Sequence, residues 1–208
     1  MPVVKLVTAA QLQIFAPRCD FLVMGPAINA ACEEFEISTP RRLKHFLGQL
    51  HHESSGLTRL EEDLTYTSAA RICEVWPKRF PTIDAALPFV RNPRALANKV
   101  YGGRLGNTGP DDGWRFRGGG LIMNTGLANY RDAGEAIGVD LVAQPELLRQ
   151  PKIAALAAGA FWARKNLNEL ADQDNAEAVS LRVNGGRNGL PDRLRQTQRA
   201  GLIWREAA

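Results

Sequence analysis

The clearest pattern of hydrophobic and polar positions runs from Thr39 to Glu53. Apolar residues recur there at the i, i+3, i+4 and i+7 spacing of one buried helix face, at Leu43, Phe46, Leu47 and Leu50. Thr39 is a favourable N-cap and Pro40 suits the first helical position. One further turn brings the same face to Glu53, directly before a Ser-Ser-Gly break. The pattern predicts a helix that aims a carboxylate along an apolar face.

Most of the remaining chain carries similar helical patterns, with Gly and Pro marking the ends of segments. We expect only one short extended segment, at residues 64–67. The predicted helices cover residues 24–35, 69–75, 82–90, 93–100, 128–137, 145–150, 151–165 and 176–183, with a first helix capped by Thr8 and a last one beginning near Pro191.

The segment from about residue 68 to residue 104 differs from the rest because prolines separate short helical pieces, at Pro77, Pro81, Pro88 and Pro93. This pattern indicates a small helical lobe inserted in a larger one. The predicted fold class is therefore all-α, or α-dominated, with two lobes and a cleft between them. A length of 208 residues suits one compact domain, so we treat residues 1–208 as a single catalytic domain.

Composition excludes several other classes of protein. Apolar residues make up 45% and charged residues 23%, which is an ordinary globular balance. No apolar run of about 18 residues occurs, so we expect no stable membrane insertion. Gln11 and Gln13 interrupt the N-terminal apolar run, and we expect no signal peptide. We therefore expect the chain to be made in a bacterial cytoplasm.

Metal and cofactor motifs are missing from the sequence. Three cysteines at irregular spacing form neither a disulfide framework nor a metal motif. The segment 172–175 resembles half of a calcium loop but lacks its glycine and its closing glutamate. The glycine run at residues 118–120 has neither the phosphate-loop nor the dinucleotide spacing. We expect no metal and no cofactor.

Basic residues concentrate near the C-terminus. The net charge is +4, and between Arg182 and Glu206 six arginines stand against only Asp192 and Glu206. Such a segment can meet nucleic acid, anionic lipid or an anionic cell wall, or it can be a solvated helix face. No nucleic-acid-binding motif accompanies the charge, so no nucleic-acid partner is expected.

Glu53 has a possible partner in Glu62, nine residues later and beyond the break. An apolar surrounding disfavours the charged form of a carboxyl group, as a general acid requires. One carboxylate in a dry environment and one in a wet environment form the arrangement that cleaves glycosidic bonds. A glutamate at a helix end is more often a solvated end residue, so the pair gains weight only from the rest of the chain.

Several blocks resemble glycoside hydrolase family 19, the chitinase-like group that includes many phage and prophage endolysins. They follow the order of the family, and together they are far more specific than any one of them. The blocks are residues 52–56 (HESSG), 60–67 (LEEDLTYT), 97–101 (ANKVY), 112–118 (DGWRFRG), 121–122 (LI), 125–126 (TG), 129–130 (NY) and 183–186 (VNGG). The resemblance implies a lysozyme-like two-lobed fold.

The resemblance also implies roles for individual residues. Glu53 is the expected general acid and Glu62 the expected general base, and the hydroxyl of Thr125 is expected to hold the attacking water, with inversion at the anomeric carbon. The expected residues that bind substrate or organise the cleft are Tyr66, Met123, Asn129, Asn184 and Arg193. The sequence departs from the family pattern at Gly119, where Arg is usual, at Met123, where Gln is usual, and at Asn124, where an aliphatic residue is usual.

The expected partner is the peptidoglycan glycan strand. A compact monomer without a signal peptide fits an endolysin that another factor releases to the cell wall. It would hydrolyse the β-1,4 bond between N-acetylmuramic acid and N-acetylglucosamine and so lyse the host cell. Three alternatives stay open at this point: a chitinase, a lytic transglycosylase that uses no water, and a catalytically impaired protein that binds the cell wall.

Overall fold

The computed structural model describes residues 6–205, and within this range it is helical with no β-strand. The prediction of an all-α fold is confirmed. The helices are α1 (Ala9–Phe15), α2 (Phe21–Glu34), α3 (Pro40–Glu53), α4 (Ala69–Val75), α5 (Ile83–Ala86), the 3-10 helix η1 (Leu87–Phe89), α6 (Pro93–Tyr101), α7 (Asp112–Arg115), α8 (Leu127–Ile137), the 3-10 helix η2 (Pro145–Arg149), α9 (Pro151–Arg164), α10 (Leu167–Asp172), α11 (Ala176–Asn184) and α12 (Leu190–Ile203).

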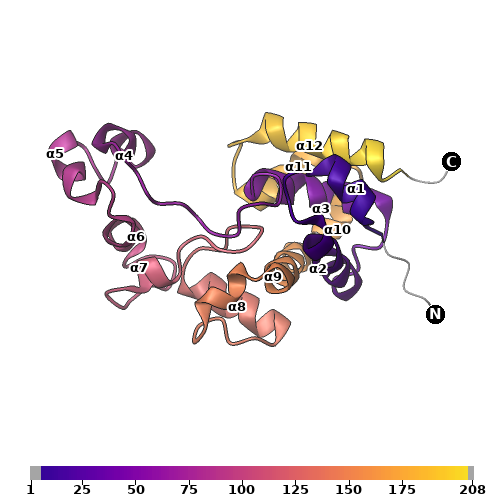
Figure 1. The fold of residues 1–208 in the computed structure, drawn as a ribbon, viewed down its shortest axis with the longest axis horizontal. Helices are drawn as coiled ribbons and strands as arrows, with labels where there is room; N and C mark the ends of the chain where they lie inside the picture. The colour runs from indigo at the N-terminus through magenta and orange to yellow at the C-terminus, as the bar shows by residue number, and fades with distance from the viewer. Residues whose placement is uncertain (1–5, 206–208) are drawn as a thin grey trace.

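The large lobe is organised around α3, with α12 packed along it and α2 packed against α9 (Figure 1). Phe46 of α3 meets Trp162 of α9 edge to face, with ring centroids 5.3 Å apart. The side chain of Thr39 caps α3 by accepting from the backbone N–H of Arg42. The apolar stripe that predicts α3 is thus buried in the main core, which places Glu53 at the edge of that core.

The small lobe has its own apolar core and lies at the opposite end of the molecule from α12 (Figure 1). Prolines keep its helices short because they begin or interrupt helical segments. The buried apolar residues of this lobe are Leu64, Ala69, Ile72, Phe80, Ala86, Leu96, Ala97 and Val100.

A third apolar cluster lies beneath the junction of the two lobes. Phe116 and Tyr130 pack edge to face there, with centroids 5.3 Å apart, and Leu148 joins them from η2. Above this cluster, the backbone of residues 118–120 pairs with residues 60–62 on one side and with Asn124 on the other. The junction therefore has a firm floor built from two loops.

The structure differs from the predicted elements at several places. Helices α7 and α10 are not among the predicted helices. The expected extended segment, residues 64–67, lies outside any helix but forms no strand, and the backbone pairing occurs at residues 60–62, where residues 118–120 supply a partner. Helix α2 begins at Phe21 and not at Met24, because the side chain of Asp20 accepts from the backbone N–H of Val23 and caps the helix earlier.

Candidate active site

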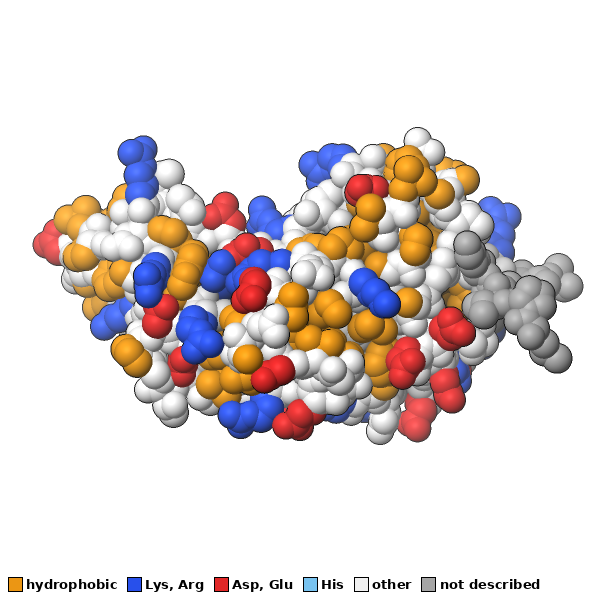
Figure 2. Space-filling model, turned by 60° about the horizontal axis from the view of Figure 1, so that its bottom comes forward, with side chains coloured by type: hydrophobic (Ala, Val, Ile, Leu, Met, Phe, Trp, Pro, Cys, Tyr) orange, Lys and Arg blue, Asp and Glu red, His pale blue; other side chains and the backbone are white. Residues whose placement is uncertain are grey.

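The surface is hollowed between the two lobes, and acidic and basic side chains gather in the hollow (Figure 2). The floor is the paired backbone of residues 60–62 and 118–120. A pocket of about 310 Å³ opens from it, lined by Glu61, Glu62, Asp63, Leu64, Thr65, Pro93, Trp114 and Arg117. The pocket therefore contains one of the two predicted catalytic carboxylates, Glu62, and its walls come from residues 61–65, α6 and the segment that contains Trp114 and Arg117.

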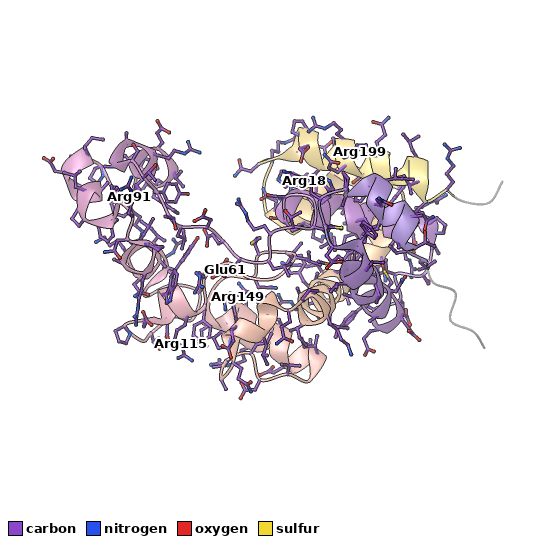
Figure 3. All side chains as sticks on the ribbon, viewed as in Figure 1. Arg18, Glu61, Arg91, Arg115, Arg149 and Arg199 are labelled. Atoms are coloured by element: carbon purple, nitrogen blue, oxygen red, sulfur yellow. The ribbon has the colours of Figure 1, made fainter. Side chains whose placement is uncertain are left out.

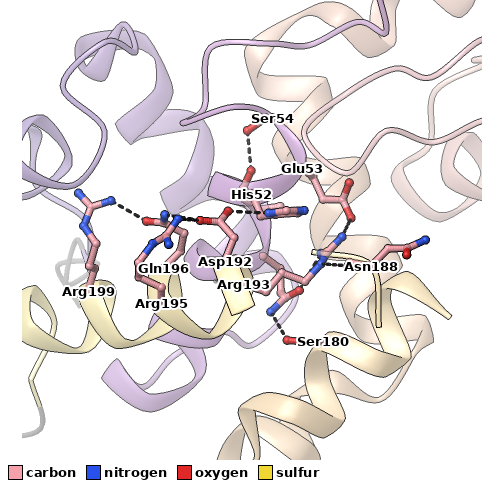
Figure 4. Close-up of polar contacts among 12 residues, drawn as sticks. His52, Glu53, Ser54, Ser180, Asn188, Asp192, Arg193, Arg195, Gln196 and Arg199 are labelled. Atoms are coloured by element: carbon pink, nitrogen blue, oxygen red, sulfur yellow. Dashed lines mark hydrogen bonds and ion pairs between the residues drawn. The ribbon is translucent and has the colours of Figure 1, made fainter. Parts of the chain in front are cut away.

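Glu53 is the last residue of α3 and forms an ion pair with Arg193 of α12, with Nη2 2.6 Å from Oε1 (Figure 4). The expectation of a dry, apolar surrounding for Glu53 is wrong. Its side chain is 21% exposed, and the group that meets it is a guanidinium. The reason is tertiary: α12 packs along α3 and brings a buried arginine to the end of the apolar stripe.

Arg193 is only 2% exposed, and its other contacts are internal. Nη1 donates to Gln49 Oε1 at 2.9 Å, and Nε donates to the backbone carbonyl of Asn188 at 3.4 Å. Gln49 in turn donates to Ser180 Oγ of α11 at 3.1 Å (Figure 4). A buried guanidinium needs acceptors for its donors, so this network fixes where it points. Of the two roles expected for Arg193, its burial favours organising the cleft.

The network continues on the outer side of α3. His52 Nδ1 lies 2.6 Å from Asp192 Oδ2, and Gln196 donates to the other carboxylate oxygen of Asp192 at 3.0 Å (Figure 4). Ser54 closes the helix, because its buried hydroxyl donates to the backbone carbonyl of Leu50 at 2.6 Å. The end of α3 is thus held on both sides of Glu53.

Glu62 is held by the small lobe and by the floor of the junction. The hydroxyl of Tyr101, at the end of α6, donates to Glu62 Oε1 at 2.6 Å, and the backbone N–H of Gly118 donates to Oε2 at 3.2 Å. Burial, followed by the negative charge of Glu62, raises the pKa of Tyr101 above its usual value. The phenol therefore stays protonated and remains a donor, which fixes the orientation of the carboxylate.

Thr125 and Glu62 lie on the two sides of Gly118. A Cβ atom at Gly118 would lie 3.0 Å from Glu62 Cβ, 3.2 Å from Glu62 Oε2 and 3.5 Å from Thr125 Oγ1, so a side chain at this position would crowd Glu62. The Thr125 hydroxyl donates to the backbone carbonyl of Met123 at 3.1 Å. Asn129 donates to the carbonyl of Thr125 at 2.7 Å. The lone pairs of the Thr125 hydroxyl can still accept from a water molecule.

The other predicted site residues divide between the two sides of the groove. Tyr66 packs edge to face on Trp76 with centroids 5.3 Å apart, and burial followed by the charge of Glu62 raises its pKa. Met123 is partly buried with a left-handed φ of 51°, next to Thr125. Asn184 ends α11 on the large lobe, five residues before the loop ends at Gly189.

Sequence reasoning missed a cationic cluster beside Glu62. Arg117 and Arg149 both contact Glu61, with Arg149 Nε 3.2 Å from Oε2, and the Arg117 guanidinium lies 3.6 Å above the ring of Trp114. Figure 3 shows Glu61 and Arg149 at the junction of the lobes. Burial, and then the like charge of Arg149, lowers the pKa of Arg117 to about 10. Trp114 and Arg117 belong to the block 112–118 that resembles the family, so the sequence could have pointed to them. No sequence feature near Arg149 indicates that its side chain reaches this site.

The structure explains why residue 119 is a glycine here and not the arginine that is usual in the family. A Cβ atom at this position would lie 2.5 Å from the hydroxyl of Tyr130, which donates to the backbone carbonyl of Arg117 at 2.7 Å. A larger side chain would displace that hydroxyl. The cations that lie closest to this floor come instead from Arg117 and Arg149.

Within residues 6–205, no cluster of three or more His, Cys, Asp or Glu side chains is arranged to hold a metal ion. The same part of the chain contains no helix with the length and apolarity needed to span a bilayer. Cys19, Cys32 and Cys73 are free thiols.

The sequence and the fold were each compared with those of known proteins. No family model matches the chain. A Haemophilus influenzae protein described as a glycosyl hydrolase family 19 domain-containing protein is 34% identical over 172 residues, covering 81% of this chain and 83% of that protein.

Solved structures of similar fold include chitinase C from Streptomyces griseus HUT6037, with a TM-score of 0.66 and 18% identity over 97% of this chain and 77% of that one. A bacterial family 19 chitinase aligns with a TM-score of 0.66 and 18% identity over 96% of this chain and 95% of its own. These two likenesses concern the fold, and the prediction of a lysozyme-like helical architecture is confirmed.

Proposed function

Because this chain belongs to glycosyl hydrolase family 19 and is a glycoside hydrolase, we propose that it cleaves bacterial peptidoglycan as an endolysin. The proposed reaction is hydrolysis of the β-1,4 bond between N-acetylmuramic acid and N-acetylglucosamine, with inversion at the anomeric carbon. The enzyme would be made in the cytoplasm, reach the cell wall after release by another factor, and lyse the cell.

The proposed mechanism divides the chemistry between the two carboxyl groups. Glu53 protonates the glycosidic oxygen, and Glu62 removes a proton from the attacking water, so the leaving group and the nucleophile are activated on opposite faces of the sugar. Thr125 accepts a hydrogen bond from that water. Tyr101 and the Gly118 N–H hold Glu62 by its two oxygens, and this contact supports its role as an oriented base.

The observation that carries the proposal is that Glu62 and Thr125 lie against the same residue, Gly118. A Cβ atom at Gly118 would lie 3.2 Å from Glu62 Oε2 and 3.5 Å from Thr125 Oγ1, so the two oxygens are near each other. A water molecule held between these oxygens would have a carboxylate to accept its proton and a hydroxyl to orient it, which an inverting glycosidase requires. A lytic transglycosylase has no need of either group.

Charge supports peptidoglycan as the substrate. The protein carries a net charge of +4, and several arginines of its C-terminal region are exposed, including Arg182, Arg187 and Arg195. Peptidoglycan bears carboxylates on its peptides, whereas chitin is uncharged, and opposite charge raises the rate of encounter between an enzyme and a polymer. The second candidate function is that of a chitinase, because the solved structures of similar fold are described as chitinases.

The deciding experiment incubates the purified protein with sodium-borohydride-reduced peptidoglycan and, separately, with chitin, and analyses soluble products by mass spectrometry. Endolysin activity gives muropeptides with new reducing N-acetylmuramic acid ends. Anhydro-muramic products indicate a transglycosylase, products from chitin alone indicate a chitinase, and binding without products indicates an impaired wall-binding protein. A Glu62→Gln variant in parallel controls for contaminating hydrolases.

A further inference from the structure

A second hollow lies on the small lobe, outside the pocket that contains Glu62. Its volume is about 640 Å³, within the range of pockets that hold small ligands. It is formed by the end of α4, the loop that follows α4, and Arg104 in the loop that follows α6. Its lining residues are Val75, Trp76, Pro77, Lys78, Arg79 and Arg104.

This hollow is strongly basic, since its lining includes three cations and no acidic residue. Lys78, Arg79 and Arg104 are all exposed. Within residues 6–205, none of the three forms a salt bridge, and the contact of the Arg104 guanidinium is a 3.3 Å hydrogen bond to the backbone carbonyl of Val100. Other arginines of this lobe are paired, such as Arg94 with Asp111 at 2.8 Å. The basic hollow thus presents uncompensated positive charge.

Its position relative to the reaction centre follows from the neighbours of its lining residues. Leu105, directly after Arg104, accepts from the backbone N–H of Ala128 at 3.0 Å and packs so closely on Gly126 that a Cβ atom there would lie 2.3 Å from Leu105 Cβ. Gly126 adjoins Thr125. On the other flank, Trp76 packs edge to face on Tyr66, which follows Glu62 by four residues. The basic hollow is therefore connected by direct packing to the segments that carry Thr125 and Glu62.

We propose that the basic hollow binds the carboxylates of the peptide substituents on muramic acid residues, so that the enzyme prefers peptide-bearing glycan to bare glycan. The inference rests on the proposed function, because only peptidoglycan carries such peptides. Long-stemmed cations on a surface hold carboxylates by charge-assisted hydrogen bonds, and the apolar parts of Val75, Trp76 and Pro77 offer a surface to the aliphatic side chains of the peptide.

The test compares two substrates made from one peptidoglycan preparation: soluble uncrosslinked strands that keep their peptides, and the same strands after an amidase has removed them. For the variant Lys78→Gln/Arg79→Gln we expect KM on peptide-bearing strands to rise about tenfold, equivalent to about 1.4 kcal/mol. The kcat should stay the same, because the contacts are equal in the ground and transition states. On bare strands both constants should match those of the wild type. The variant Arg104→Gln should shift KM in the same direction.

A matched control is Arg91→Gln/Lys99→Gln, which removes two charges from exposed positions of the same lobe that do not line the basic hollow. It should behave as the wild type on both substrates. Salt provides a second readout: raising the ionic strength from about 0.05 M to about 0.5 M should reduce the wild-type preference for peptide-bearing strands, because salt screens exposed charges.

The inference is overturned if the wild type cleaves peptidoglycan and Lys78→Gln/Arg79→Gln leaves the ratio of KM values on the two substrates unchanged. A different result, in which the wild type cleaves chitin and neither form of peptidoglycan, overturns the proposed function itself. The two failures are therefore distinguishable in the same experiment.

Discussion

Arg193 and Glu53 are 140 residues apart in the sequence, and their side chains meet with Nη2 2.6 Å from Oε1. Arg193 is buried and receives its orientation from Gln49 and Asn188. The ion pair restrains the carboxyl group by one oxygen. We therefore expect the other oxygen, Oε2, to face the glycosidic bond and to deliver the proton.

Glu53→Gln should lower the rate of lysis by at least about a hundredfold, since general acid catalysis typically contributes about 10²–10⁴-fold. The amide oxygen can still accept from Arg193, so the melting temperature should change little. Turbidity loss of purified cell walls and differential scanning fluorimetry measure the two quantities. Glu34→Gln, at an exposed position of α2, is the control. Lysis near the wild-type rate by the folded Glu53→Gln protein would exclude the assignment.

Tyr101→Phe should reduce kcat by about 10- to 100-fold, because a hydrogen bond to a charged group contributes about 1.5–3 kcal/mol and here orients Glu62. The control is Tyr130→Phe, which removes a hydroxyl that donates to a backbone carbonyl instead. We expect that variant to lower the melting temperature more than kcat. Equal effects of both variants on kcat would show that the Tyr101 contact has no special part in the reaction.

The products should carry the α configuration first, because water is expected to attack the face opposite the leaving group. Proton NMR of the anomeric region during the first minutes of hydrolysis of a soluble oligosaccharide strand measures this before mutarotation. Initial formation of the β anomer would mean retention, and it would contradict the role of Glu62 as a base that activates water.

Gly119→Ala should destabilise the fold by about 1–3 kcal/mol, because its Cβ would approach the Tyr130 hydroxyl to 2.5 Å. In the double variant with Tyr130→Phe the loss should be smaller than the sum of the two single losses, since the clashing atom is gone. Gly186→Ala is the control, because the nearest atom to its Cβ is 3.8 Å away. Urea unfolding measures the stability of the four variants and of the wild type. Strictly additive losses in the double variant would refute the clash.

Stability should fall as the pH drops below about 6.5, in part through His51. Burial, and then the positive charge of Arg199, lowers the pKa of His51 below its ordinary value, which is about 6.5 in an unfolded chain. Between these two pKa values the unfolded state binds more protons than the folded state. The stability that comes from the neutral, buried His51 is therefore fully present above about pH 6.5 and is lost as the pH falls through the folded-state pKa. The melting temperature of His51→Gln should therefore decrease less between pH 7.5 and pH 5.5 than that of the wild type. An identical decrease would exclude this contribution.

Much of the secondary structure could be predicted from the sequence because its causes are local. Helix α3 matches its N-cap at Thr39, its first residue at Pro40 and its apolar stripe, and α4 matches the prediction for residues 69–75 exactly in extent. Caps, prolines and the 3.6-residue period act within one or two turns, so they are readable along the chain. The start of α2 depends on an equally local cap, Asp20, which the prediction missed, whereas the backbone pairing of residues 60–62 depends on a partner about 60 residues away in the sequence.

By itself the sequence determined most of the helices, the family resemblance and the choice of Glu53, Glu62 and Thr125 as candidate catalytic residues. Only the tertiary structure decided that Glu53 is paired with Arg193 and that Tyr101 of the small lobe holds Glu62. It also decided that Glu62 and Thr125 both lie against Gly118. These contacts join residues that are far apart in the sequence and that meet only when the apolar faces of the helices pack together. Burial of apolar surface drives that packing but is not directional. The spacing of residues along the chain therefore does not give the distances between these side chains.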